Sequence, residues 1–175
     1  VLFRSPLENL GSINLQSYDV VAVGPGLGRT DEAKVLVNSL LERQSGHMVI
    51  DADGLYALGT IGHVYAHGDK TITYEGNMQF KNCIMTPHLG EFSRLIDTSI
   101  NFIEKHYVEL AIQFAVAHNV VLVLKGIPSL VAFPTGEVYI NMIGNPGMGT
   151  GGMGDSLTGI IAAFVAQGYS LQSAA

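Results

Sequence analysis

A glycine-rich segment that ends in a carboxylate is the clearest chemical feature of the sequence. Six glycines fall within residues 144–154, and Asp155 follows them at the start of an apolar, helix-like stretch. Glycine lets backbone N–H groups turn toward an anion, and a helix N-terminus adds partial positive charge. This pattern predicts an oxyanion or phosphate cradle, with Asp155 placed to accept a proton from a substrate hydroxyl. The alternative is a flexible loop in which Asp155 only caps the helix.

Four further polar or glycine-rich clusters each follow a short hydrophobic run that we predict to be a β-strand. The clusters are residues 24–28, 51–54, 86–91 and 125–126, which follow the runs 18–23, 47–50, 82–85 and 120–124. Ligands of open α/β sheets bind beyond the carboxyl ends of the strands. We therefore expect these clusters and the glycine-rich segment to form one ligand-binding crevice.

The residue types in these clusters leave their roles open. Lys125 either meets a phosphate as a point charge or is solvated. His88 either satisfies local hydrogen bonds or takes part in the chemistry. Glu91 suits the start of a helix and is also the kind of group that orders Mg²⁺ and its water. Asp51 and Asp53 either cap a helix or face the ligand.

Two common nucleotide motifs fit poorly. Residues 147–152 match the spacing G-x-G-x-x-G, but they follow a predicted hairpin instead of the first strand of a βαβ unit, and no Lys-Ser/Thr pair of a P-loop follows. Residues 24–28 follow a strand, but Arg29 takes the place of the third glycine. A conventional Rossmann site is therefore disfavoured. His63 and His67 lack a supporting carboxylate or helix, which favours surface positions over a metal site.

Strands and amphipathic helices alternate along the chain. This order predicts a largely parallel α/β sheet covered on both faces, with one antiparallel hairpin. Residues 59–80 show no clear period, and we expect a surface excursion there. The predicted helices are 30–43, 103–118 and 156–167, the last ended by Gly168, and the hairpin strands are 129–133 and 137–140.

Composition restricts the class of protein. The 175 residues are 47% hydrophobic and 14% charged, which excludes an intrinsically disordered chain and suits a single domain over residues 1–175. The net charge is −6 and no basic run is present, so we expect no nucleic-acid partner. Because the apolar stretch near residues 160–166 is too short to span a bilayer, we expect no membrane insertion. The single cysteine, Cys83, fits a reducing, cytoplasmic setting.

The order of these motifs resembles the ATP- or ADP-dependent NAD(P)H-hydrate dehydratase family of the ribokinase-like superfamily. The resemblance runs from Tyr18 to Gly168 through VGPGLG, DADGL, TPHLGEFSRL, VLKG and GNPGMGTGGMGDSLTGIIAAFVAQG. It implies a three-layer αβα sandwich. It also implies that hydrated NADH or NADPH (NADHX or NADPHX) is restored to NADH or NADPH with ATP or ADP as co-substrate and Mg²⁺ as cofactor. We expect a homo-oligomer in the full-length protein.

The resemblance also implies roles for individual residues. Asp155 would be the base on the substrate hydroxyl. The backbone of Gly152, Met153 and Gly154 would form the anion hole. Glu91 would place Mg²⁺ through water, in the motif His88-x-x-Glu91. The implied binding residues are Gly28, His88 and Asp155 for the hydrated dinucleotide, and Lys125, Gly126, Ile127, Pro128, Ser129 and Gly154 for the adenine nucleotide.

The sequence departs from the family pattern in a few places. A strand-rich segment usual before Tyr18 and a portion following Ala175 are missing, so we expect a domain truncated at both ends. Ser129 stands where threonine is common, and residues 59–80 form a longer connection than usual.

Two other functions compete with the dehydratase. A hydroxyethylthiazole or hydroxymethylpyrimidine kinase would use the same anion hole and Asp155 but release a phosphorylated product. His88 in place of asparagine, together with GPGLG and DADGL, favours the dehydratase. A non-enzymatic nucleotide-binding module is the third possibility, and the retention of Asp155, Glu91 and the whole glycine loop argues against it.

Overall fold

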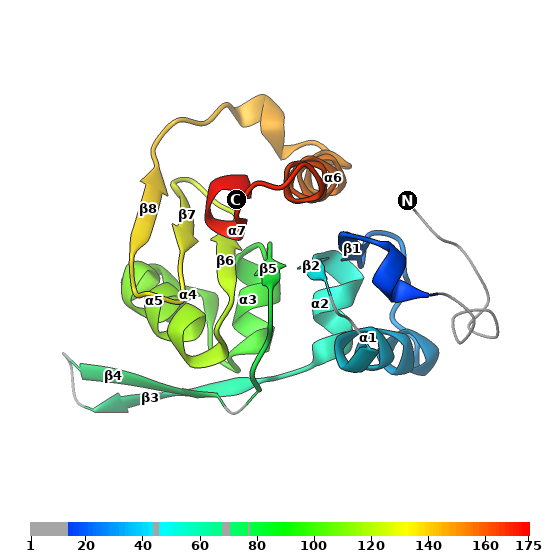
Figure 1. The fold of residues 1–175 in the computed structure, drawn as a ribbon. Helices are drawn as coiled ribbons and strands as arrows, with labels where there is room; N and C mark the ends of the chain where they lie inside the picture. Colours follow the sequence, from blue (N-terminus) through cyan, green and yellow to red (C-terminus); the bar gives the residue numbers. More distant parts are fainter. Residues whose placement is uncertain (1–13, 44–45, 68–70, 77) are drawn as a thin grey trace.

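A six-stranded sheet forms the centre of the protein. The structure, a computed structural model, describes residues 14–43, 46–67, 71–76 and 78–175 (Figure 1). The strand order is β1-β2-β5-β6-β7-β8, in which β1, β2, β5 and β6 are parallel and β7 and β8 add an antiparallel hairpin. This confirms the predicted α/β class. The strands are β1 (Val20–Val23), β2 (His47–Ile50), β5 (Cys83–Met85), β6 (Val121–Leu124), β7 (Ser129–Ala132) and β8 (Val138–Asn141).

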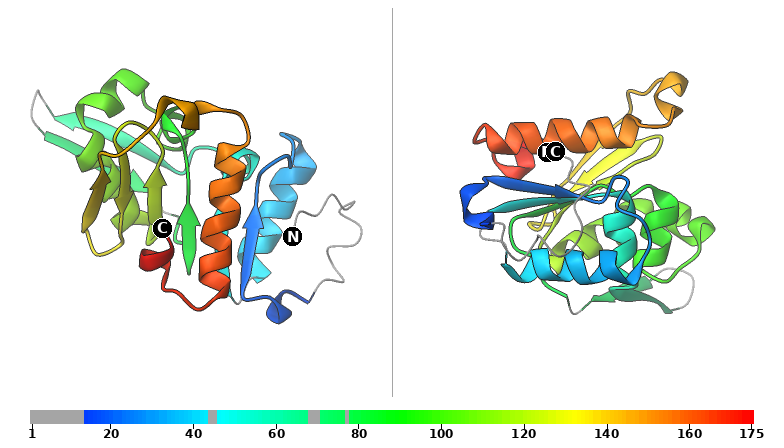
Figure 2. Two further views of the ribbon diagram at one scale, coloured as in Figure 1. Left: turned by 90° about the horizontal axis from the view of Figure 1, so that it is seen from above. Right: turned by 90° about the vertical axis from the view of Figure 1, so that its right-hand side faces the viewer.

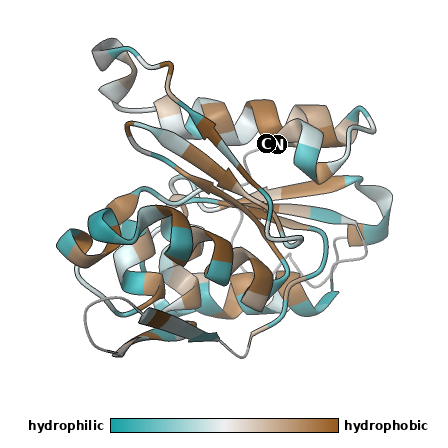
Figure 3. Cartoon of the chain, turned by 90° about the vertical axis from the view of Figure 1, so that its left-hand side faces the viewer, coloured by the Kyte–Doolittle hydropathy of each residue, from teal (hydrophilic) through white to brown (hydrophobic). Residues whose placement is uncertain are grey.

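The central strands β2, β5, β6 and β7 are hydrophobic because both faces of the sheet are buried there. In β2, Met48 and Ile50 belong to one hydrophobic cluster, whereas Val49 belongs to another on the opposite face. The same alternation continues through β5, β6 and β7. Figure 3 shows the hydrophobic central strands between helices that carry both hydrophobic and hydrophilic residues. A parallel sheet covered on both faces requires this pattern.

Helices cover the two faces unequally, in three layers (Figure 2). The larger cluster lies under the first five helices, and the smaller one lies under the last two. Within the described ranges, no helix is long and apolar enough to cross a membrane. The helices are α1 (Asp31–Arg43), α2 (Ala52–Leu58), α3 (Leu89–Leu95), α4 (Ile100–Lys105) and α5 (Tyr107–His118) on one face, and α6 (Met153–Ala166) and α7 (Leu171–Ala174) on the other.

The connection from β8 to α6 crosses the sheet. β8 is one edge strand, whereas α6 packs over β1 and β2 toward the other edge. The segment between them, which includes a short 3₁₀ turn (Pro146–Gly149), arches across in Figure 1. The glycine-rich residues therefore reach the same end of the sheet as the turns that follow β1, β2, β5 and β6.

Some element boundaries differ from the predictions. The predicted helix 103–118 is two helices, α4 and α5, which meet at His106. α6 begins at Met153 instead of residue 156, because Gly152 takes a left-handed φ of 87° and turns the chain into the helix earlier. β1 begins at Val20, since a 3₁₀ turn (Leu15–Ser17) extends to Tyr18, whose N–H donates to the Leu15 carbonyl.

A separate hairpin was missed between residues 59 and 80. β3 (Gly62–His67) and β4 (Thr71–Gly76) form an antiparallel two-stranded sheet that packs against α5. Ile72 and Tyr74 of β4 are buried. The residues that alternate with them are exposed, namely Thr71, Thr73 and Glu75. This alternation is typical of a half-buried strand, so the sequence did contain a signal for β4.

His118, at the end of α5, joins this hairpin to the core. Its imidazole is fully buried, with Nδ1 2.6 Å from the Met78 carbonyl and Nε2 2.5 Å from the Tyr74 hydroxyl. A carbonyl only accepts, so Nδ1 carries the proton and Nε2 accepts from Tyr74. The ring also contacts Phe80 and Phe114. Burial lowers the pKa of His118 below its usual 6.5, which opposes protonation in the folded state.

We expect His118 to make stability depend on pH. Because the folded pKa is lowered, the unfolded chain takes up the proton first, and the free energy of unfolding decreases as pH falls below about 6.5. The slope attributable to one proton is at most ~1.4 kcal/mol per pH unit. Urea titrations from pH 8 to 5 measure it. The neutral His118→Gln variant should show a smaller decrease than the wild type. The exposed histidine variant His63→Gln should retain the wild-type slope, and equal slopes in all three proteins would contradict this role.

Candidate active site

A buried ion pair lies at the carboxyl end of the sheet. Asp51, directly after β2, is 1% exposed, and its Oδ1 lies 2.7 Å from Nζ of Lys125, directly after β6. Its Oδ2 accepts a hydrogen bond of 2.9 Å from the hydroxyl of Thr158 in α6. A buried carboxylate is costly unless it is paired and hydrogen-bonded. These contacts meet that requirement and tie two strands to α6.

The alternation of side chains along the strands explains this meeting. Asp51 follows Val49 by two residues, and Lys125 follows Val123 by two, which places both on the α6 face of the sheet. β5 lies between β2 and β6 and continues into Thr86. Among the described residues, the fully buried Thr86 hydroxyl has no hydrogen-bond partner. This hydroxyl at the sheet end is therefore open to a polar group or a water molecule.

The first turn of α6 lies directly over this ion pair. A Cβ placed on Gly154 would lie 3.4 Å from Lys125 Nζ and 3.6 Å from Asp51 Oδ2. In the part of the chain that the structure describes, the N–H groups of Gly152 and Gly154 have no acceptor, whereas the Met153 N–H lies 3.4 Å from the Thr150 carbonyl. Unpaired N–H groups at a helix start suit an anion. The predicted anion-hole residues thus lie at the start of α6.

Asp155 occupies the third position of α6. Its side chain is exposed and makes no hydrogen bond or ion pair with the described residues. The helix cap is Gly152, which has no side chain, so Asp155 does not act as the capping residue that the sequence left open. The carboxylate is therefore available to a ligand at the helix start.

His88 and Glu91 hold the turn between β5 and α3. The Nδ1 atom of His88 accepts from the N–H groups of Gly90 and Glu91 at 3.0 and 3.2 Å, and Glu91 Oε2 accepts from the His88 N–H at 2.9 Å. Glu91 Oε1 lies 3.4 Å from Nε2 of His88. The backbone N–H of Lys125 donates to the Pro87 carbonyl at 2.8 Å. The backbone bridge between the two turns places His88 beside Lys125, and the capping box ties Glu91 to His88.

The turn after β1 is held by the second aspartate of the DADG sequence. Asp53 Oδ2 accepts from the Gly28 N–H at 3.0 Å, and Oδ1 lies 2.9 Å from Nε of Arg29. The guanidinium groups of Arg29 and Arg94 lie 4.8 and 4.0 Å from the ring centre of Tyr56. Burial, together with the charge of Arg29, lowers the pKa of Arg94. Gly28 therefore lies within a basic, aromatic cluster.

Tyr107 and Ser129 shape the loop that follows Lys125. The Tyr107 hydroxyl donates to the carbonyls of Leu124 and Pro128 at 3.2 and 3.0 Å, and burial raises its pKa to about 12. The Ser129 hydroxyl donates to the Gly126 carbonyl at 2.8 Å. Ile127, between these residues, is 83% exposed. The loop thus exposes the apolar side chain of Ile127, while hydrogen bonds from Tyr107 and Ser129 fix its backbone.

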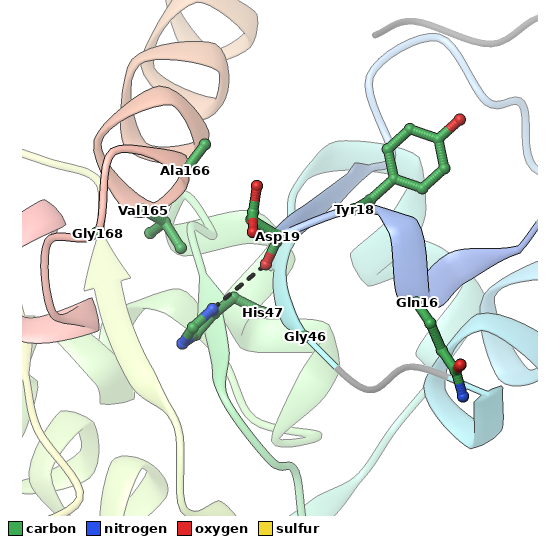
Figure 4. Close-up of a pocket in the computed structure, with 8 residues that line it drawn as sticks. All are labelled: Gln16, Tyr18, Asp19, Gly46, His47, Val165, Ala166 and Gly168. Atoms are coloured by element: carbon green, nitrogen blue, oxygen red, sulfur yellow. Dashed lines mark hydrogen bonds between the residues drawn. The ribbon is translucent and has the colours of Figure 1, made fainter.

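A surface hollow of about 360 Å³ lies at the other end of the sheet. Figure 4 shows it between the starts of β1 and β2 and the end of α6, with His47 beside the Asp19 backbone. The predicted site residues lie at the opposite strand ends, so this hollow is separate from the candidate active site.

The structure thus brings the predicted clusters to one end of the sheet. Contacts link the turn after β1 to Asp53, and link Asp51 and Lys125 to the start of α6. Sequence reasoning missed Thr158, Tyr107 and Arg94. Thr158 follows Asp155 by three residues in the same predicted helix, a spacing that indicates neighbouring positions on its surface.

Comparison with known proteins places the chain in a family. The sequence profile of the family described as NAD(P)H-hydrate dehydratase matches residues 5–175. The chain belongs to the NAD(P)H-hydrate dehydratase family. A bifunctional NAD(P)H-hydrate repair enzyme Nnr from Moorella thermoacetica is 42% identical over 156 residues, which make up 88% of this chain and 27% of that protein. An ADP-dependent (S)-NAD(P)H-hydrate dehydratase from Bacillus subtilis is 32% identical over 146 residues, or 83% of this chain and 47% of that protein.

Solved structures of dehydratase-family and ribokinase-like proteins share the fold. An ADP/ATP-dependent NAD(P)H-hydrate dehydratase from Bacillus subtilis, co-crystallised with ATP/Mg²⁺ and soaked with CoA, matches with a TM-score of 0.70 and 29% identity over 90% of this chain and 53% of that chain. A ribokinase-like superfamily protein from Enterococcus faecalis matches with a TM-score of 0.69 and 29% identity over 91% of this chain and 53% of that one. The chain thus spans about half of each of these solved structures.

Substitution of Gly24 tests how tightly the turn after β1 packs against Asp51. A Cβ at Gly24 would lie 1.7 Å from the Asp51 carbonyl oxygen, and the φ of 132° is itself unfavourable for other residues. Gly26, in the same turn with a φ of 67°, has open space around it. We expect Gly24→Ala to lower the free energy of unfolding by at least ~2 kcal/mol more than Gly26→Ala. Chemical denaturation measures both, and equal losses would show that the turn has room to shift.

Proposed function

We propose that the protein dehydrates hydrated NADH and NADPH to NADH and NADPH, with ATP or ADP as phosphoryl donor. The observation that carries the proposal is the start of α6, where an unpartnered carboxylate follows two unpaired N–H groups directly above Lys125. Membership of the family supplies the substrate class, and the described residues supply groups of the required chemistry.

The first step is transfer of the terminal phosphoryl group to the ring hydroxyl. Asp155 accepts the hydroxyl proton as the oxygen–phosphorus bond forms, and the bond to the nucleotide breaks. The N–H groups at the start of α6 and the ammonium group of Lys125 stabilise the negative charge of the transferred group. Phosphoryl transfer needs mainly positioning and such charge stabilisation.

The second step is elimination. The ring nitrogen donates its electron pair toward the adjacent carbon, and the carbon–oxygen bond breaks to release phosphate. Loss of a proton from the neighbouring ring carbon completes the double bond. Phosphate leaves more readily than hydroxide, which is why the nucleotide is consumed. The products are the reduced dinucleotide, phosphate and the shortened nucleotide.

A magnesium ion suits the residues at this end of the sheet. Mg²⁺ typically takes one or two protein carboxylates together with water and substrate phosphates. In the described residues no group of three or more His, Cys, Asp or Glu side chains gathers as a preformed metal site. The hard oxygen donors near Lys125 are Glu91 and Asp51, and the orphaned Thr86 hydroxyl lies between the same strands. Glu91, through water, would hold the ion, which would neutralise phosphate charge.

The two sides of Lys125 suit the two substrates. On the β1 side, Gly28 and His88 line a region where Arg29 and Arg94 supply positive charge for an anionic dinucleotide. On the other side, residues 125–129 present backbone groups and the exposed Ile127 to an adenine nucleotide. Gly154 lies between them, close to Lys125.

We also propose that the protein acts in the cytoplasm as a homo-oligomer. The free, buried thiol of Cys83 is compatible with a reducing compartment. Exposed apolar residues on β8, such as Tyr139 and Ile140, support an association between copies.

The proposed activity is tested by restoring NADH from its hydrate. The protein as its gene encodes it is incubated with hydrated NADH, ATP and Mg²⁺, and NADH absorbance and phosphate release are followed together. We expect both signals to rise in equal amounts. A phosphorylated product without NADH would indicate a small-molecule kinase instead. Binding of ATP without either signal would indicate a nucleotide-binding module.

Asp155→Asn tests the role of the base. Because the amide cannot accept the hydroxyl proton, we expect kcat to fall by about 10²–10⁴-fold with little change in ATP binding. Asp31→Asn is the matched control, since Asp31 also lies in the first turn of a helix but pairs only with Lys34 at the surface. Retention of wild-type kcat in Asp155→Asn would exclude Asp155 as the base.

A further inference from the structure

The two aspartates of the turn between β2 and α2 contact different parts of the site. Asp51 contacts Lys125 and Thr158, which belong to β6 and α6. Asp53, two residues later, contacts Gly28 and Arg29, which follow β1. α2 begins between them at Ala52. The two carboxylates of this short turn therefore point to different elements, Asp51 toward β6 and α6 and Asp53 toward the turn after β1.

Neither the Asp51 nor the Asp53 carboxylate caps the N-terminus of α2. Asp51 is the N-cap residue of α2 by position, but its side chain makes no capping hydrogen bond. Aspartate at this position usually bonds the N–H groups of the first turn. Here Asp51 Oδ1 instead accepts from Lys125, 74 positions later in the sequence, and Oδ2 accepts from Thr158, 107 positions later. The long-range contacts have replaced the local ones.

We propose that Asp51 and Asp53 are positioning residues with separate effects, Asp51 on the nucleotide and phosphoryl transfer and Asp53 on the hydrated dinucleotide. This inference rests on the proposed function and assigns each carboxylate to one substrate of that reaction. Neither residue is required to touch a substrate.

Asp51 acts through Lys125 and α6. The Lys125 ammonium group is held 2.7 Å from Asp51 and beneath Gly154, and Thr158 fixes the same carboxylate to the helix that carries Asp155. Without the Asp51 charge, no carboxylate holds the Lys125 ammonium group in a fixed position relative to the start of α6. Small misplacements of catalytic groups lower rates strongly.

Asp53 acts through the turn after β1. By accepting the Gly28 N–H and holding Arg29, it fixes the backbone at Gly28 and the direction of the guanidinium group beside Tyr56. The exposed fraction of the Asp53 side chain is 21%, compared with 1% for Asp51. The Asp53 contacts therefore lie nearer the surface, on the side proposed for the dinucleotide.

Steady-state kinetics of Asp51→Asn and Asp53→Asn test the division. For Asp51→Asn we expect a rise in KM for ATP and a fall in kcat of about 10²-fold, with KM for hydrated NADH within about twofold of wild type. For Asp53→Asn we expect KM for hydrated NADH to rise about tenfold, as for loss of a charge-assisted hydrogen bond, with KM for ATP and kcat within about twofold. Asp97→Asn, at an exposed carboxylate that faces His63, is the control for loss of charge.

A second variant and a binding measurement separate positioning from misfolding. Thr158→Val keeps the charge pair and removes only the hydrogen bond from α6, so it should shift the same parameters as Asp51→Asn to a smaller extent. Calorimetric titration with ATP should show weaker binding in Asp51→Asn and wild-type binding in Asp53→Asn, even if the hydrate is not a substrate. Equal changes for both substrates in both aspartate variants, with melting temperatures near wild type, would overturn the division.

Discussion

The pairing of Asp51 with Lys125 inside the protein constrains everything around it. The Asp51 carboxylate is removed from water at the end of a hydrophobic sheet, and its charge is tolerated there only while it is paired and hydrogen-bonded. The two residues follow strands that are separated by β5, so the side chains reach across the end of that strand. The turn after β2, the loop after β6 and the start of α6 must therefore keep their positions together. Gly24 is a glycine for the same reason, since a Cβ there would lie 1.7 Å from the Asp51 carbonyl oxygen.

The path of the chain makes this pairing possible. The antiparallel hairpin carries the chain to one edge of the sheet, and the segment after it returns across the strand ends to α6, over β1 and β2 (Figure 1). A helix that arrives from across the sheet presents its N-terminal turn to the loops after β2 and β6. The partial positive charge of that turn and the ammonium group of Lys125 then act on the same region.

The sequence predicted the strands well because burial on both faces leaves a continuous hydrophobic run, and glycine and polar residues mark each strand end. It predicted less where distant contacts decide the outcome. The hairpin of β3 and β4 depends on His118, which lies more than forty residues beyond Tyr74 in the sequence, and no local pattern shows that pairing. The break at His106 and the early start of α6 follow from packing and from one left-handed glycine. Asp51 and Lys125 were both recognised as candidates, but their pairing was not predicted. Side chains two positions apart along a strand point to the same face of the sheet. Asp51 follows Val49 and Lys125 follows Val123 by two positions, so this alternation would have placed Asp51 and Lys125 on one face.

Four carboxylates near the strand ends show how one fold assigns different tasks to the same chemical group. Asp51 is buried and committed to a charge and a hydroxyl, Asp53 holds a glycine N–H and an arginine, and Glu91 closes a capping box with His88. Each of these three has its oxygens engaged by neighbouring groups. Asp155 differs because its side chain is exposed and makes no hydrogen bond or ion pair with the described residues. A general base must be free to take a proton and give it up in each cycle. In the proposed reaction the oxygens of Asp51, Asp53 and Glu91 are already occupied by the contacts that hold the site, whereas both oxygens of Asp155 are open to a substrate hydroxyl.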